Sequence, residues 1–161
     1  MLRRNCLIAS AAFAALVGCV TPGTQAQFQN SAVIGESEAQ VWANLIGYFT
    51  SNNIPIKTIE RDSGVIYAER SSFGGRIEPT LASCDQNAML VVTNGSAAMN
   101  VFVQALSASQ TRVTVNVTFQ EVGAYGAQTY PITCYSTGAL EAAVLGAAGA
   151  AVTVVPAAPP A

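Results

Sequence analysis

The sequence predicts an α+β protein: an antiparallel β-sheet of four to five strands, with an N-terminal and a C-terminal helix packed on one face. Residues 112–120 alternate strictly between polar and apolar side chains, which is typical of an antiparallel strand with one buried and one solvent-exposed face. Before and after the predicted strands, apolar residues recur at helical spacing instead. Runs of strands with helices at both ends indicate a two-layer α+β sandwich.

The first helix is predicted over residues 37–53, "SEAQVWANLIGYFTSNN". Ser37 followed by Gln40 forms a capping box at its start, and the two asparagines at its end can adopt a positive φ. Its apolar face contains Val41, Trp42, Leu45, Ile46 and Phe49. We interpret Trp42 as a core anchor in preference to a ligand-stacking residue.

A β-hairpin is predicted next, over residues 54–70. Its turn lies at residues 61–64, where Asp and Ser precede a glycine that can adopt the left-handed conformation. Pro55 cannot donate a hydrogen bond to a strand ladder, so the first strand is expected at an edge of the sheet or at the point where the chain enters it.

Residues 71–87 contain Gly-Gly and Pro and predict a long irregular loop. Loops of this length in compact domains are commonly functional or mobile. The candidate partner-contact residues in this loop are Phe73, Arg76 and Ile77. The solvent-exposed face of the sheet is a further candidate contact surface.

Three further strands are predicted after this loop. The apolar run 88–93 suits a buried strand, a tight turn follows at Asn94-Gly95, and strands at 97–106 and 111–122 complete a meander. After a glycine-rich loop at 123–129, Ser136 or Thr137 can cap the last helix. Its apolar side contains Leu140, Val144, Leu145 and Ala148.

The N-terminus has the design of a secretory signal, with Arg3 and Arg4 ahead of an apolar stretch of about a dozen residues. The stretch ends in Leu16-Val17-Gly18-Cys19, which resembles the bacterial lipobox. The resemblance implies that residues 1–18 are removed and that Cys19 carries the lipid. Two alternatives remain open: a plain signal cut near Ala26, and Cys19 as an ordinary buried thiol.

The resemblance also implies a domain organisation and a location. Residues 19–35 are expected to be the lipid anchor and a flexible spacer, with a first strand near Ala32 to Ile34, and residues 36–152 a single periplasmic domain. Residues 153–161 form a Pro/Ala tail that is expected to be disordered. Val rather than Asp at position 20 resembles lipoproteins passed to the outer membrane, so we expect an anchor in the outer membrane facing the periplasm.

The cysteine count predicts one disulfide. Of four cysteines, Cys6 leaves with the signal and Cys19 carries the lipid, which leaves Cys84 and Cys134 as an even pair in an exported chain. Two separate buried thiols are the alternative. A metal site is not expected, because two thiolates without a histidine make an incomplete ligand set.

Composition excludes several functions. The chain contains no histidine, which removes histidine-based triads and histidine metal sites. Without Arg3 and Arg4, five basic residues face nine acidic ones, so no basic patch for nucleic acid is expected. Serines have no general base nearby in the sequence, and Asp62, Glu78 and Asp85 suit turns and surface loops. We therefore expect no enzyme and no cofactor.

Residues 41–70 are similar to the helix–strand–turn–strand unit of the small helix-grip-like domains in a lipoprotein component of the outer-membrane β-barrel assembly machinery. In that family a helix with a Val-Trp pair leads into a strand ending in an acidic residue, then a glycine turn and an outgoing strand; here these are Val41-Trp42, Glu60 and Gly64. That family has two such domains and a long N-terminal segment. The resemblance therefore implies the fold and not the assembly role.

The function expected from the sequence is that of a non-catalytic accessory or scaffolding module of a cell-envelope complex, with an envelope protein as partner. The alternative is a binding module for a small apolar ligand or lipid, held in a helix-grip pocket between sheet and helix.

Overall fold

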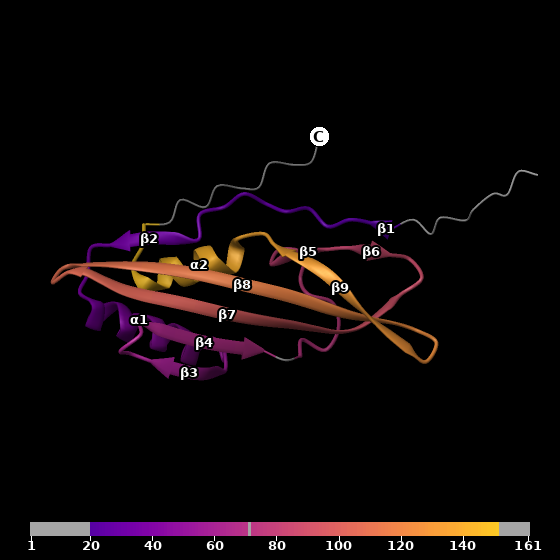
Figure 1. The fold of residues 1–161 in the computed structure, drawn as a ribbon, viewed down its shortest axis with the longest axis horizontal. Helices are drawn as coiled ribbons and strands as arrows, with labels where there is room; N and C mark the ends of the chain where they lie inside the picture. Colours follow the sequence, from indigo (N-terminus) through magenta and orange to yellow (C-terminus); the bar gives the residue numbers. More distant parts are fainter. Residues whose placement is uncertain (1–19, 71, 152–161) are drawn as a thin grey trace, which may run out of the picture.

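The computed structural model describes residues 20–70 and 72–151 (Figure 1). The predicted signal peptide, the predicted lipidation residue Cys19 and the Pro/Ala tail therefore lie outside the described residues. The elements in chain order are β1 (Val20–Thr21), β2 (Ser31–Ile34), α1 (Glu38–Ser51), β3 (Ile56–Glu60), β4 (Val65–Arg70), β5 (Ala82–Cys84), β6 (Gln86–Asn87), β7 (Val91–Ser107), β8 (Gln110–Tyr125), β9 (Gln128–Ser136) and α2 (Ala139–Ala148).

Seven strands form the main sheet, and every pairing recorded among the described strands is antiparallel. The order is β3-β4-β7-β8-β9-β5, with β2 also paired to β8, while β1 and β6 form a separate two-stranded ladder. Because β7 follows β8 along nearly its whole length, β2 and β9 share the other edge of β8. The long β7–β8 hairpin extends through the whole molecule (Figure 1).

The strand register determines which residues share the buried face of the sheet and which share the exposed face. Ile66, Val101 and Val115 lie side by side on β4, β7 and β8, and all three are fully buried. The neighbouring register row of Tyr67, Asn100 and Asn116 lies on the opposite face. The period-two alternation of the sequence thus places the apolar residues under the helices.

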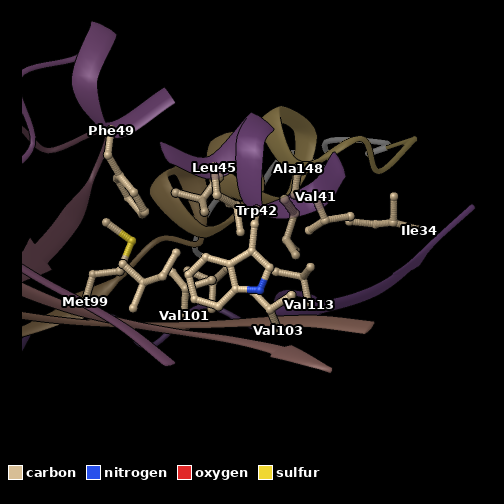
Figure 2. Close-up of a cluster of buried hydrophobic side chains, with 14 residues drawn as sticks. Ile34, Val41, Trp42, Leu45, Phe49, Met99, Val101, Val103, Val113 and Ala148 are labelled. Atoms are coloured by element: carbon tan, nitrogen blue, oxygen red, sulfur yellow. The ribbon is translucent and has the colours of Figure 1, made fainter. Parts of the chain in front are cut away.

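Both helices pack on the buried face and contact each other (Figure 2). Trp42 and Phe49 of α1 point down onto β7 and β8 and fill the space beneath the helix (Figure 2). The helix begins as expected, since the Gln40 N–H donates to Ser37 Oγ at 3.4 Å, and it ends beside Asn53, whose φ is 51°. The main core contains Ile34, Val41, Trp42, Leu45, Phe49, Ile66, Met99, Val101, Val103, Val113, Val115, Val144, Leu145 and Ala148.

The predicted class is confirmed as a mixed fold with an antiparallel sheet and two helices, but the predicted number of strands was too low. The tight turn expected at Asn94-Gly95 was wrong, because β7 runs through both residues with a register shift between Val92 and Asn94. A Cβ on Gly95 would lie 2.7 Å from Ile77 Cγ1, so this glycine permits close packing and does not form a turn.

The end of the chain also differs in detail from the prediction. The glycine-rich loop is only the short turn around Gly126, since β8 continues to Tyr125 and β9 begins at Gln128. The last helix begins at Ala139 with Gly138 as its N-cap residue, and the Thr137 hydroxyl just ahead of it accepts the Ala139 N–H at 3.4 Å. Ser136 is the last residue of β9, and its hydroxyl donates to the Glu141 carboxylate.

Residues 20–35 lie along the domain, where a free spacer was expected. The predicted first strand is present as β2, which pairs with the start of β8. Ahead of it, the Gly23 N–H donates to Asp85 Oδ1 at 2.7 Å and the Thr24 N–H donates to Ser83 Oγ at 2.9 Å. The segment is held because the fold offers it side-chain acceptors and a free part of the β8 edge.

Candidate functional site

The predicted contact loop is partly packed onto the domain. Phe73 is half-buried, with its N–H donating to the Gly95 carbonyl at 2.8 Å and the Arg70 guanidinium 5.3 Å from its ring centroid. Arg76 is exposed and donates to Gln86 Oε1 at 3.1 Å. Ile77 is only 3% exposed, so its assignment as a contact residue was wrong. It is buried because it packs against Gly95 and lies in a second apolar cluster with Phe119 and Ile132.

The disulfide between Cys84 and Cys134 is confirmed. The two residues lie opposite each other in the β5–β9 ladder, 50 residues apart in the sequence. The bond therefore closes the loop that contains β6, β7 and β8. It also ties the short strand β5 to the edge of the sheet.

A buried carboxylate lies next to this disulfide. Glu121 of β8 points into the second cluster, and its Oε1 accepts the Ile77 N–H at 2.7 Å, while its Oε2 has no hydrogen-bond partner. The side-chain ligand atoms of Glu121, Cys84 and Cys134 lie within 4.8 Å of one another. With the two sulfurs bonded to each other, neither is a thiolate, so this group of residues serves packing and not metal binding.

A second buried carboxylate contacts the part of the β8 edge that lies between β2 and β9. Between the residues of β8 that pair with β2 and those that pair with β9, the Val117 N–H donates to Glu141 of α2. The Ser136 hydroxyl donates to the same carboxylate at 2.8 Å. Burial raises the pKa of the Glu141 carboxyl above its ordinary value of 4.5, although these hydrogen bonds favour the ionised form. Glu141 therefore acts as an internal acceptor that docks α2 onto the sheet.

We expect Glu141→Gln to be more stable than the wild type at neutral pH. A carboxyl whose pKa is raised by folding stabilises the protein most below its unfolded value of 4.5, and this stability is lost as pH rises through the folded pKa. Glutamine offers both an acceptor and a donor at the same place. Urea unfolding at neutral pH should give Glu141→Gln a higher free energy of unfolding than the wild type. Urea unfolding below pH 4.5 should show no such difference.

The matched control is Glu78→Gln, since Glu78 is exposed. It should show no such pH-dependent difference from the wild type. Glu141→Ala, which leaves the Val117 N–H and the Ser136 hydroxyl without their acceptor, should cost about 2 kcal/mol. A Glu141→Gln variant with the same free energy of unfolding as the wild type at every pH would contradict the role given to this carboxylate.

The outer sheet face, defined here by Tyr67, Asn100, Phe102, Thr114 and Asn116, is one candidate contact surface. Register places these residues on the side of the sheet opposite the helices. Phe102 of β7 is 45% exposed, with Asn100 and Thr114 beside it and Arg112 farther along the same face of β8. This arrangement offers an apolar contact with a polar surround.

The apolar tip, defined here by Met89, Leu90, Val91, Tyr125, Tyr130 and Pro131, is the other exposed surface. It lies where β7 begins, β8 ends and β9 begins, and all of these residues except Val91 line a cavity of about 370 Å³ together with Asn87. Val91 is 70% exposed and Tyr125 is 57% exposed. The interpretation of the run 88–93 as a buried strand was therefore wrong at this end, because no described helix or strand covers it.

Local packing holds the tip in place. A Cβ on Gly123 would lie 2.9 Å from the Leu90 Cβ, so the absence of a side chain on β8 lets Leu90 pack down. Gly126, with a φ of 60°, makes the turn between Tyr125 and β9. The tip is thus an ordered surface, held in place by packing at the end of two paired strands.

The first described residue lies beside this tip. Val20, which follows Cys19 in the sequence, pairs with Asn87 in the β1–β6 ladder. Asn87 also lines the cavity of the apolar tip. The chain thus enters the fold at the end of the molecule where these apolar side chains are exposed.

Comparison of the chain with protein-family models gave no match, and neither did comparison with curated protein sequences. Within residues 20–70 and 72–151, neither helix is long and apolar enough to cross a bilayer.

Proposed function

We propose that this protein is a membrane-anchored periplasmic lipoprotein, lipidated on Cys19, that serves as a non-catalytic accessory or scaffolding module of a cell-envelope complex. The Leu16-Val17-Gly18-Cys19 tetrapeptide supports the anchor, and Val20 in place of Asp supports an outer-membrane location. The disulfide supports an oxidising compartment such as the periplasm. An envelope protein is the proposed partner.

The observation that carries the scaffolding role is the outer sheet face. It presents the exposed Phe102 ring with hydroxyl and amide groups around it, and no described helix covers it. Protein interfaces commonly combine an apolar centre, enriched in aromatic residues and depleted of charge, with a polar rim. The face is therefore suited to contact another protein.

The two buried glutamates support a non-catalytic function. Glu121 and Glu141 each accept hydrogen bonds from the fold itself, and both are almost completely buried. A catalytic carboxylate needs access to a substrate. Both groups are instead used to hold segments of the chain on the sheet.

The packing under α1 weighs against the alternative of an apolar ligand held between helix and sheet. Trp42, Leu45 and Phe49 point from the helix onto the strands and occupy that space (Figure 2). A ligand there would have to displace these side chains from the main core.

Photocrosslinking in intact cells tests the proposed partner surface. A benzoylphenylalanine placed at Phe102 should give one defined protein adduct in the membrane fraction. The matched control position is Ile59, which is 47% exposed on the edge strand β3 and should give none. Adducts of equal yield from both positions, or none from Phe102, would contradict the proposal.

A further inference from the structure

We infer that the apolar tip rests in the interfacial region of the lipid bilayer and orients the domain on the membrane. The inference rests on the proposed function, because it takes Cys19 to be the lipid anchor. It adds a second membrane contact, made by folded residues of the domain. The contacting chemistry is the boundary between headgroups and acyl chains.

The composition of the tip suits this boundary. Its exposed side chains are apolar or tyrosine, and no charged residue lines its cavity. Tyrosine is enriched at membrane interfaces, where its ring meets the acyl boundary and its hydroxyl stays hydrated. The Tyr130 hydroxyl donates to Gln128, so this ring carries its own polar partner at the edge of the patch.

The path of the chain indicates what covers the tip. Val20 pairs with Asn87, and Asn87 belongs to the lining of the tip cavity. Figure 1 shows β1, β6 and the turn between β8 and β9 at the same end of the molecule. Since the proposed anchor is the residue before Val20, the lipid and the tip meet the membrane from the same end of the domain.

Hydrogen bonds hold the segment after the anchor onto the domain. The Gly23 N–H donates to Asp85 Oδ1 at 2.7 Å and the Thr24 N–H donates to Ser83 Oγ at 2.9 Å. A segment bound in this way fixes the anchor end relative to the tip, unlike a flexible linker. The bilayer is therefore a better match for the tip than a partner that arrives from solution.

The same geometry places the outer sheet face away from the membrane. Phe102 lies about 35 Å along β7 from Val91, at roughly 3.3 Å per residue of strand. Interfacial contacts extend only about 5 to 10 Å into the bilayer. The tip would therefore stand in the headgroup region while Phe102 remains accessible in the periplasm.

Quenching of tryptophan fluorescence by brominated phospholipids tests this arrangement in the full lipidated chain, extracted from cells and reconstituted into phosphatidylethanolamine–phosphatidylglycerol vesicles. The native Trp42 is 2% exposed in the core and gives a constant background. Tyr125→Trp places a reporter at the tip, and Phe102→Trp is the matched control on the outer sheet face. Val91→Trp is a second tip reporter at a position that is 70% exposed and tolerant of substitution.

Both tip variants should lose up to about half of their emission, because one of their two indoles lies at the depth of the bromines. The Phe102→Trp variant should lose none. The quenching should be unchanged at high salt, since the tip has no charge to be screened. Equal quenching at the tip and at the control, or no quenching at either tip position, would overturn the inference.

Two further readouts separate this inference from its alternatives. The mass of the N-terminal peptide is measured on the same vesicles: an acylated Cys19 without tip quenching overturns only the inference, whereas an unacylated Cys19 defeats the proposed function. Tip emission that shifts with protein concentration in detergent, without vesicles, would assign the tip to a second copy of the chain and overturn the bilayer contact.

Discussion

Replacing both Cys84 and Cys134 with alanine is expected to lower the free energy of unfolding by about 4 kcal/mol. The bond joins residues 50 apart in the sequence, and a loop of this length strongly restricts the unfolded chain. In the folded state it also secures β5, a strand of three residues at the end of the sheet that pairs, among the described strands, only with β9. Urea unfolding of the double variant measures the loss.

Two controls accompany this measurement. The wild type with its disulfide chemically reduced should lose about the same stability as the double variant. Thr133→Ala, at the exposed position beside Cys134, should stay within about 0.5 kcal/mol of the wild type. A double variant that unfolds at the same urea concentration as the oxidised wild type would show that the bond contributes nothing to the fold.

Trp42→Ala is expected to cost about 4 kcal/mol of unfolding free energy. The ring is 2% exposed and lies between α1 and the sheet, where its removal leaves a large cavity (Figure 2). Its Nε1–H donates to Glu38 Oε1 at 3.2 Å, one turn earlier in the helix, so the substitution also leaves Glu38 without this donor. Denaturant unfolding followed by far-UV circular dichroism measures the change.

Arg61→Ala separates the core contribution of Trp42 from its surface contact. The Arg61 guanidinium lies 5.4 Å from the centroid of the Trp42 ring, and an exposed cation–π contact is worth only about 0.5 to 1 kcal/mol. Trp42→Phe, which keeps part of the ring volume, should fall between the two alanine variants. If Trp42→Ala cost no more than Arg61→Ala, Trp42 would not be an anchor of the core.

Local patterns predicted those elements whose structure depends on nearby residues. The alternation over 112–120 located β8, and Ser37 and Asn53 marked the two ends of α1. The turn predicted at Asn94-Gly95 was wrong because the same dipeptide suits both a tight turn and a close approach of two segments. Only the arrival of Ile77, from a distant part of the sequence, decides between them.

The candidate contact surfaces were less predictable than the disulfide. Counting cysteines sufficed to pair Cys84 with Cys134, since the other two were assigned to the N-terminal segment. The apolar run 88–93 has the composition of a buried strand, and its exposure follows from the absence of a covering element among the described residues. Conversely, Ile77 lies in a loop, as predicted, but it is buried, because its N–H donates to Glu121, 44 positions later in the chain.

The proposal that this domain is a lipid-anchored module of the bacterial envelope is tested most directly by the intact mass of the protein extracted from membranes. We expect a chain that begins at Cys19 and carries three acyl chains on that residue, two in a diacylglyceryl thioether and one on its amino group. A chain that begins near Ala26, or one that retains Cys19 without lipid, would contradict it.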